Sequence, residues 1–313
     1  MTVTIRDVAR ASGVHVSTVS RSFSAPHLVN QATRDRVLAA ADQLGYRPNR
    51  AARALTTGRT MNLGLIVADI ANPFFPPLIK AAQGHARTHD YHVFVADTDE
   101  DPATEEELIR TLAKQVDGVL LCSPRLANDT IVRLAEDVPF VVVNREIEGL
   151  PCVLMDVAQG ARLALEHLRG LGHTRLAYVG GPAGSWTSEQ MRAAATGVPV
   201  IGPNQPTAQG GLAAAQAVAD SGATGVLAYN DLVALGLIEG LAGLGVHVPG
   251  DVSVIGVDDI LPGRLNRPKL TTVAMPAPAA GRAAVDLLMD DAGASVTLPT
   301  SLIVRESTGE AHR

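Results

Sequence analysis

From Met61 onward the chain alternates short apolar runs with segments that have the spacing of amphipathic helices. The apolar runs have the length and β-branched content of strands. They read NLGLIVADI, YHVFVADT, DGVLLCS, PFVVVNR, RLAYVGG, TGVLAYND and DVSVIGVDD. The segments between them include PPLIKAAQGHARTH, EEELIRTLAKQV, ARLALEHLRGLG and LVALGLIEGLAGLG. Strands that alternate with helices form parallel sheets covered on both faces, so this part of the chain predicts an α/β fold with two such sheets in tandem.

Polar residues stand at the ends of these predicted strands, where folds of this kind bind their ligands. They are Asp69, Asn72, Asp97, Asn144, Arg145, Asn230, Asp231, Asp258 and Asp259. Carboxylates and amides suit a polyhydroxylated ligand, because a hydroxyl donates to a carboxylate and accepts from an amide. We therefore expect a sugar or a nucleoside. The alternative for each residue is a structural role, since acidic groups at strand ends also cap helices and close turns.

The first sixty residues differ in charge from the rest. They hold nine Arg, no Lys and three Asp, which gives +6, whereas residues 61–313 hold 17 basic and 29 acidic residues, which gives −12. The total of −6 argues by itself against nucleic acid as a partner. The distribution favours a small domain that neutralises phosphate, with a solvated basic surface as the alternative.

Two short helices are predicted within this basic segment. TIRDVARAS places Ile5, Val8 and Ala9 on one face, Thr4 can cap its first turn, and Gly13 ends it. A second helix that begins near Val16 would bury Val19 and project the polar side chains of the stretch VSTVSR. Short hydroxyl side chains and an arginine suit the major groove of DNA, where a thin helix approaches phosphates and base edges closely.

A third helix and a linker follow. QATRDRVLAAADQLG predicts a helix that Asn30 caps and Gly45 ends. In YRPNRAARALTTGRT, Asn49 is placed to cap a short helix that displays Ala52 and Leu55. Such a helix is too small to be stable alone. We expect it to fold when docked in a minor groove, with Leu55 as an apolar wedge at a base step.

The motifs TIRDVARASGVHVSTVSR and LGYRPNRAARAL resemble the DNA-binding headpiece and hinge helix of the LacI/GalR family of bacterial transcription regulators. The resemblance implies that Val16 and Ser17 choose operator bases, that Arg21 meets a guanine and that Leu55 intercalates. It also implies phosphate contacts. At the position where the family usually has a capping Ser, this chain has His15. The expected DNA-binding residues are Thr4, His15, Val16, Ser17, Thr18, Ser20, Arg21, Asn30, Thr33, Asn49, Ala52 and Leu55.

The rest of the chain is similar to the same family, from NPFF through DEDP, VNR, LEHLRGLGHTRLAYVGGP, YNDLVALG, VPGDVSVIGVDDI and LTTV to VRES. This resemblance implies a periplasmic-binding-protein-like effector domain, in which two Rossmann-like lobes hold an effector in the cleft between them. The residues that would line the cleft by motif are Asp69, Asn72, Phe74, Asn144, Arg145, Asn230 and Asp258.

One region departs from the family pattern. Residues 197–210 form a shortened segment that offers no aromatic side chain to stack on an effector. Met191 falls where the family's effector-binding arginine is expected, and Arg192 lies one step away. Trp186, the only tryptophan, either supplies the stacking surface or packs at the edge of a lobe. Trp186 and Arg192 complete the set of expected effector-binding residues.

The expected domains are a helix-turn-helix headpiece at 1–47, a hinge helix or linker at 48–60, and an effector-binding and dimerisation domain at 61–313. Within the last, we expect a first lobe at 61–158 plus 276–298 and a second lobe at 159–275 plus 299–313.

Two other classes of protein share features with this chain. An enzyme of this fold needs a convergent nucleophile and base, a cofactor loop or a metal cluster, and we expect no catalytic set, no cofactor and no metal. The acidic stretch DTDED lacks the alternation of a calcium loop and predicts a solvated turn, and neither Cys122 nor Cys152 has a metal-binding spacing. A secreted solute-binding protein would need a signal peptide where the basic segment stands.

The favoured function is that of an effector-controlled repressor. No apolar run is long enough to cross a membrane and no signal peptide is expected, so we expect a cytoplasmic protein. Two headpieces on a near-palindromic operator require a homodimer. PPLIKAAQGHA and LVALGLIEGLAG are the candidate interface helices, because we expect them to carry more exposed apolar and small residues than a solvated helix needs. No leucine heptad follows VRES, so we do not expect a tetramer.

Overall fold

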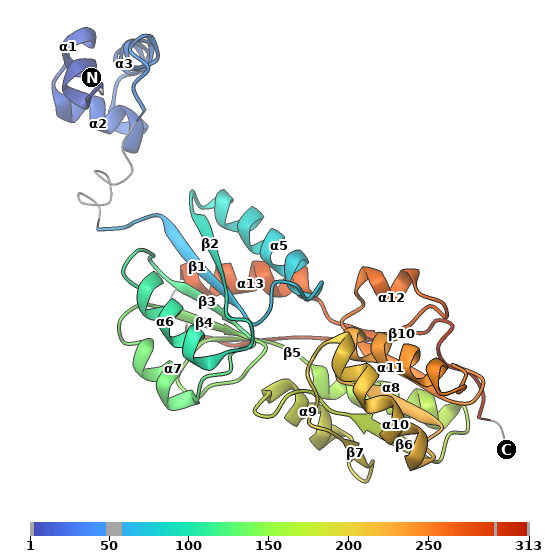
Figure 1. The fold of residues 1–313 in the computed structure, drawn as a ribbon. Helices are drawn as coiled ribbons and strands as arrows, with labels where there is room; N and C mark the ends of the chain where they lie inside the picture. Colours follow the sequence, from blue (N-terminus) through green and yellow to red (C-terminus); the bar gives the residue numbers. More distant parts are fainter. Residues whose placement is uncertain (1–2, 48–57, 291–292, 312–313) are drawn as a thin grey trace. The chain divides into compact units, whose positions relative to one another are not determined.

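The computed structural model describes residues 3–47, 58–290 and 293–311. The chain divides into two compact units, Met1–Thr60 and Met61–Arg313, which are considered separately (Figure 1). Asn49, Ala52 and Leu55, the residues expected in a hinge helix, lie outside the described residues.

The first unit contains the three helices that the sequence predicts. They are α1 (Ile5–Ser12), α2 (Val16–Ser24) and α3 (Gln31–Gln43), with a single turn of 3-10 helix, η1 (Pro26–Leu28), before α3. Val8, Val19 and Val37, one from each α-helix, are fully buried and form the centre of a small core. The turn between α1 and α2 is possible because Gly13 adopts a left-handed conformation, with φ 64°.

The second unit confirms the prediction of two sheets in tandem. The first sheet is parallel throughout and has the order β11-β5-β4-β3-β1-β2. Its central strands are apolar and almost fully buried, as expected for a parallel sheet with helices on both faces. The strands are β1 (Asn62–Val67), β2 (His92–Asp97), β3 (Val119–Cys122), β4 (Phe140–Val143), β5 (Cys152–Met155) and β11 (Val296–Leu298).

The second sheet has the order β12-β10-β9-β8-β6-β7 and departs from the prediction at one edge, where β12 runs antiparallel to β10. All its other pairs are parallel. The strands are β6 (Leu176–Val179), β7 (Val200–Ile201), β8 (Gly225–Ala228), β9 (Ser253–Val257), β10 (Thr271–Ala274) and β12 (Ser301–Ile303).

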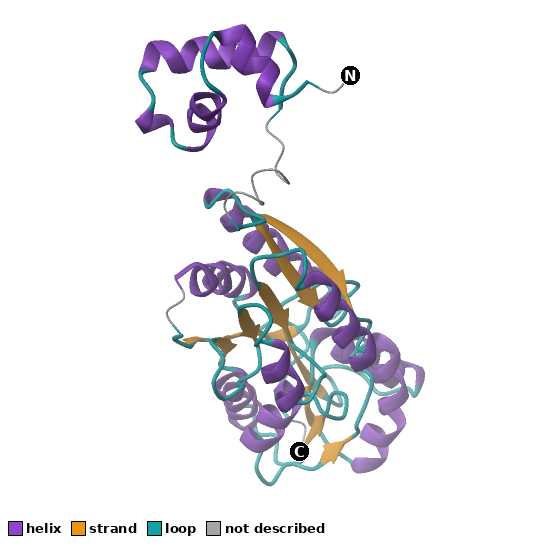
Figure 2. Ribbon diagram, turned by 90° about the vertical axis from the view of Figure 1, so that its left-hand side faces the viewer, coloured by secondary structure: helices purple, strands orange, loops and turns teal. Residues whose placement is uncertain are grey.

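Helices cover both faces of each sheet (Figure 2). In the first lobe they are α5 (Phe75–Thr88), α6 (Pro102–Leu112), α7 (Asn128–Leu134) and α13 (Ala277–Asp290). In the second lobe they are α8 (Val157–Gly170), α9 (Trp186–Ala194), α10 (Ala208–Ser221), α11 (Asp231–Gly243) and α12 (Leu261–Leu265). The chain passes between the lobes after β5, after β10 and after β11, and one cluster of buried apolar residues runs through both lobes.

The argument that α5 and α11 carry surplus exposed apolar residues is wrong. Leu78 of α5 is 1% exposed, and Leu237 and Leu241 of α11 are fully buried within their own lobe. Among the described residues, no helix has the length and apolar character needed to cross a bilayer.

Candidate functional site

Helix α2 presents one polar face on the first unit. Val19 is fully buried against α1 and α3, whereas Ser17, Ser20 and Arg21 are exposed, and Val16 and Thr18 are half-buried. Hydroxyl groups and a guanidinium can donate hydrogen bonds to phosphates and to the acceptors of base edges. A face of this composition on a short, narrow helix has the chemistry needed to enter a groove of DNA.

His15 caps α2, although Ser is usual at this position in the family that the sequence resembles. The His15 Nδ1 accepts a hydrogen bond from the Ser17 backbone N–H at 3.3 Å and lies 2.8 Å from the Ser17 hydroxyl oxygen. A ring nitrogen that accepts from a backbone N–H carries no proton, so in the neutral ring the proton is on Nε2. The imidazole can therefore cap the helix and still donate from Nε2 to a phosphate.

Side chains also fix the starts of α1 and α3. The Asp7 carboxylate accepts from the Thr4 backbone N–H at 3.0 Å and from the Thr4 hydroxyl at 2.7 Å, which fixes the start of α1. The Asn30 Oδ1 accepts from the Ala32 N–H at 3.0 Å and caps α3. Thr33, one turn along the same helix, is half-buried.

A pocket lies between the two lobes of the second unit. Most of its lining residues lie in the loops that follow strands of the two sheets, because the carboxyl ends of these strands converge there. They are Asn72, Phe74, Phe75, Glu100, Ser123, Arg125, Asn144, Thr187, Pro206, Tyr229, Asn230, Val257, Asp258 and Met275. Of the expected effector-binding residues, this list contains Asn72, Phe74, Asn144, Asn230 and Asp258.

Asn144 joins the lobes at the pocket. It follows β4 with φ 63°, and its Nδ2 donates to the Thr187 hydroxyl of the second lobe at 3.1 Å and to the Ser123 hydroxyl at 3.4 Å. Its Oδ1 is buried and has no hydrogen-bond partner among the described residues. A buried acceptor of this kind is costly unless a ligand hydroxyl or a water molecule satisfies it.

The other expected amides also have structural partners. The Asn72 Oδ1 accepts from the Phe74 N–H at 3.0 Å. Asn230 caps α11 by accepting from the Val233 N–H at 2.8 Å and donates to the Pro206 carbonyl at 2.9 Å. Each amide lines the pocket and shapes it at the same time.

Asp258 follows β9 with φ 117°, a backbone conformation that L-residues rarely adopt. Burial raises the pKa of its carboxyl well above the ordinary value, and the nearby Asp231 carboxyl raises it further. A protonated carboxyl both donates and accepts hydrogen bonds. Burial therefore favours the form of the Asp258 carboxyl that can both donate to and accept from a ligand hydroxyl.

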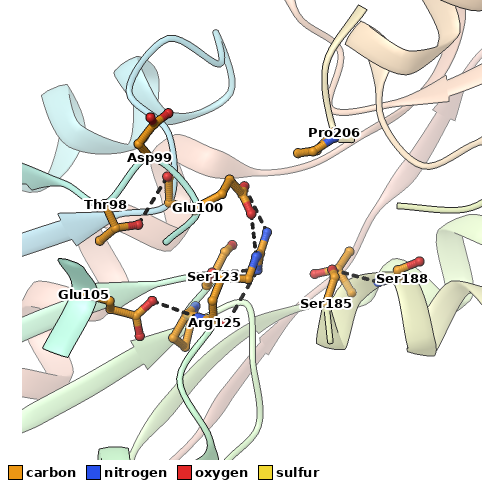
Figure 3. Close-up of polar contacts among 12 residues, drawn as sticks. Thr98, Asp99, Glu100, Glu105, Ser123, Arg125, Ser185, Ser188 and Pro206 are labelled. Carbon is orange, nitrogen blue, oxygen red and sulfur yellow. Dashed lines mark hydrogen bonds and ion pairs between the residues drawn. The ribbon is translucent and has the colours of Figure 1, made fainter. Parts of the chain in front are cut away.

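An ion pair that the strand-end list omitted stands in the pocket (Figure 3). Arg125 donates from Nε to Glu100 Oε2 at 2.5 Å and from Nη2 to Glu100 Oε1 at 3.0 Å, and its side chain is 9% exposed. The buried Glu105 carboxylate fixes the loop that carries this arginine by accepting from the Arg125 N–H at 2.8 Å and the Leu126 N–H at 3.4 Å. Ser185 and Pro206 of the second lobe lie across from the pair.

A clear signal for Arg125 is present in the sequence. It comes three residues after the strand in DGVLLCSPR, so the rule that selected Asn144 also applies to it. Tyr229, in YND, follows β8 directly and donates to or accepts from the Ser185 hydroxyl at 3.0 Å.

Two expected first-lobe residues lie outside the pocket lining. The Asp69 carboxylate turns back onto its own loop and accepts from the Ala71 N–H at 2.8 Å. The Arg145 guanidinium donates to the carbonyls of Pro124 at 3.0 Å and Leu126 at 2.8 Å. Arg145 therefore braces the loop that carries Arg125.

The two residues expected from α9 also lie outside the lining. Trp186 begins the helix and is half-buried, and Arg192 is exposed and pairs with Glu189 at 2.6 Å. Met191, the neighbour of Arg192 on α9, is fully buried, and its Sδ lies 3.8 Å from the Tyr178 hydroxyl oxygen.

The acidic stretch DTDED ends at the start of α6, where Asp101 caps the helix by accepting from the Thr104 N–H at 2.9 Å.

Two family models match the chain. The model described as periplasmic binding proteins and sugar binding domain of the LacI family matches residues 60–306. The model described as bacterial regulatory proteins of the lacI family matches residues 4–49.

Individual proteins resemble the chain over nearly its whole length. The HTH-type transcriptional regulator GalS of Salmonella typhimurium is 33% identical over 312 residues, which cover 95% of this chain and 92% of that protein. Among solved structures, the lac repressor dimer bound to operator and the anti-inducer ONPF has a TM-score of 0.87 at 25% identity, covering 99% of this chain and all of that one. A LacI family regulator from Enterococcus faecalis with bound ribose has a TM-score of 0.74 at 29% identity and covers 80% of this chain and all of that one.

Proposed function

The chain belongs to the LacI family of DNA-binding bacterial transcription regulators. We propose that it is a repressor whose operator affinity is controlled by a neutral sugar bound between its two lobes. The observation that carries the proposal is the pocket itself. The carboxyl ends of strands from both sheets meet there, and the buried Oδ1 of Asn144 can accept a hydrogen bond from a ligand. Since bacterial DNA lies in the cytoplasm, the protein would act there.

The first unit supports the DNA-binding half of the proposal. Ser17, Ser20 and Arg21 form the exposed face of α2, and Arg21 has the donor geometry to meet O6 and N7 of a guanine. His15, Thr18, Asn30 and the other polar residues around α2 would meet phosphates, which position the helix in the major groove.

The charges in the pocket favour a neutral ligand. Among the described residues that line the pocket, Arg125 is the one cation, and Glu100 already neutralises it through two hydrogen bonds. A phosphorylated ligand would have to displace Glu100 and leave that carboxylate without its partner. A neutral sugar needs no such exchange, because its hydroxyls can donate to Asn144 Oδ1 and bond to the carboxyl of Asp258.

Aromatic rings supply the apolar part of the site. Phe74 and Phe75 stack edge to face with ring centroids 5.1 Å apart, and both line the pocket together with Tyr229. Pockets for small ligands combine such apolar walls with a few polar groups that set the orientation. The solved relative that holds ribose supports a sugar over a nucleoside.

A ligand bound here would act on the lobes, because its contacts come from both. Asn144 already bonds across the boundary to Thr187, and a sugar in contact with both lobes would favour one arrangement of them over another. We propose that this arrangement decides whether two copies of the chain can hold a near-palindromic operator as a symmetric dimer, as the lac repressor dimer does in its complex with operator.

Edge strand β2 offers a surface for the second copy. Phe94 of this strand is 46% exposed, which is unusual for a phenylalanine on an edge strand.

We propose that the pocket binds its ligand without a reaction. Among the described residues, the pocket hydroxyls of Ser123 and Thr187 bond to the amide of Asn144 and not to a base, which supports this proposal because a nucleophilic hydroxyl needs a base to activate it.

The experiment is a thermal-shift screen of neutral sugars and nucleosides on the full chain, repeated with two arginine variants. Arg125→Ala removes the guanidinium of the pocket, whereas Arg192→Ala removes an exposed arginine of the second lobe that also pairs with a glutamate. We expect a sugar that raises the melting temperature of the wild type and of Arg192→Ala but not of Arg125→Ala. The proposal is contradicted if both variants respond like the wild type, or if only nucleosides bind.

A further inference from the structure

Helices α5 and α13 of the first lobe lie side by side and run in the same direction (Figure 1). They approach closely at Gly281, where a Cβ atom would lie 2.4 Å from the carbonyl oxygen of Leu78. The absence of a side chain at Gly281 thus sets the helix spacing. One to two turns further along, the same spacing brings Asp286 of α13 against His85 of α5, with the His85 Nε2 2.5 Å from the Asp286 Oδ1.

A second histidine completes the cluster. His89 follows α5 by one residue and lies four positions after His85, so the two rings stand on the same face one turn apart. Their ring centroids are 5.4 Å apart. One ligand atom from each of His85, His89 and Asp286 lies within 4.8 Å of the other two. In the part of the chain that the structure describes, this is the one group of three such ligands so close together.

We propose that His85, His89 and Asp286 form a binding site for one Zn²⁺ ion or a similar divalent transition metal on the first lobe. Imidazole nitrogens and a carboxylate oxygen are ordinary ligands of Zn²⁺, with bonds of about 2.0–2.2 Å. Two ligands at tetrahedral positions around such an ion stand about 3.3 Å apart, so the observed spacing needs only small side-chain rotations. His89 and Asp286 are exposed and His85 is 26% exposed, so these rotations are free of core packing and the ion can enter from solvent.

The ion would clamp the two helices that frame one side of the effector pocket. Helix α5 begins at Phe75, which lines the pocket, and α13 begins two residues after Met275, which also lines it. His85 lies ten residues into α5, about 15 Å from its start. The metal site is thus remote from the pocket, yet it would fix the spacing of the helices that lead from it.

The cysteines offer no competing site. Cys122 and Cys152 are buried, and burial raises the pKa of the Cys122 thiol to about 12, so its metal-binding thiolate form is disfavoured. The exposed pair His247 and Asp251 of the second lobe supplies a matched control, since it places one His and one Asp four residues apart and, among the described residues, forms no group of three possible metal ligands.

The test is a titration of the untagged full-length protein with Zn²⁺ alone, followed by its metal content after gel filtration and by its melting temperature. We expect one Zn²⁺ per chain and a higher melting temperature with metal, because an ion that binds the folded state stabilises it. His89→Ala and Asp286→Asn should each bind Zn²⁺ at least about tenfold more weakly, and His247→Ala should bind like the wild type.

The proposal is overturned if the wild type binds no Zn²⁺ in this titration. It is also overturned if His89→Ala and Asp286→Asn match the wild type in affinity and stoichiometry, or if His247→Ala loses the ion. Melting temperatures measured without metal show whether a variant is merely less stable. The outcome does not depend on whether the protein responds to a sugar.

Discussion

Substitution of Gly236 by Ala should separate two helices of the second lobe. Gly236 lies in α11, and a Cβ atom there would lie 1.8 Å from the carbonyl oxygen of Ala208, the first residue of α10. Ordinary contact begins at 3.4 Å, so one of the helices must move by about 1.6 Å. Overpacking against a backbone atom falls at the upper end of the usual range, about 3 kcal/mol. In a unit of this size that lowers the melting temperature by roughly 6–12 °C.

The single tryptophan makes this measurement specific. Trp186 lies in the second lobe, so its fluorescence during heating follows the unfolding of that lobe. Because Pro206 and Asn230 stand at the starts of α10 and α11, Gly236→Ala should also weaken the response to a sugar. The control is Gly243→Ala, two turns further along α11, where a Cβ atom meets nothing within 4 Å. This control should be neutral or stabilise by up to about 1 kcal/mol. Equal melting of Gly236→Ala and the wild type would refute the close packing of α10 on α11.

Other predictions concern the first unit and the buried acid of the second. His15→Ala removes the cap of α2 and should cost the headpiece about 1 kcal/mol in hydrogen exchange of its amides, whereas His15→Ser should not; equal exchange in both variants contradicts the capping role. Arg21→Ala should weaken binding to a selected operator by about 1–3 kcal/mol and relax specificity at one base pair. An equal loss on random DNA would reduce Arg21 to a phosphate contact. Burial raises the pKa of Asp231 from 3.8 to about 7, so the folded state favours the protonated acid and the free energy of unfolding should fall as pH rises through this window. Asp231→Asn should flatten that slope in urea unfolding, and an unchanged slope would assign the pH dependence to other groups.

The strand-end rule explains why much of the pocket could be predicted. In each parallel sheet the residues after the strands gather at one end, and the two ends face the same pocket, so Asn72 and Asn144 of the first lobe lie near Asp258 of the second although they are far apart in the sequence. The rule predicts which residues lie near the pocket, but it does not predict where their side chains point. The Asp69 carboxylate turns onto the Ala71 N–H, a choice made by the local loop that no spacing reveals.

The direction of the side chains on α9 could not be predicted from the sequence either. Met191 and Arg192 are adjacent, and which of them faces the lobe depends on the rotation of the helix by one residue. The structure buries Met191 and leaves Arg192 in solvent, paired with Glu189. The cap by His15 was unpredictable for a different reason, because an imidazole reaches a backbone N–H only at a particular ring orientation.

The most direct test of the account measures operator affinity of the full chain with and without the sugar found by thermal shift. A palindromic operator is first selected from random DNA, and binding is then followed by fluorescence anisotropy at fixed salt. We expect the sugar at saturation to change the dissociation constant of the wild type at least tenfold, about 1.4 kcal/mol of coupling, and to leave Arg125→Ala unchanged. An operator affinity that is the same with and without a saturating sugar would contradict the coupling of the pocket to the headpiece.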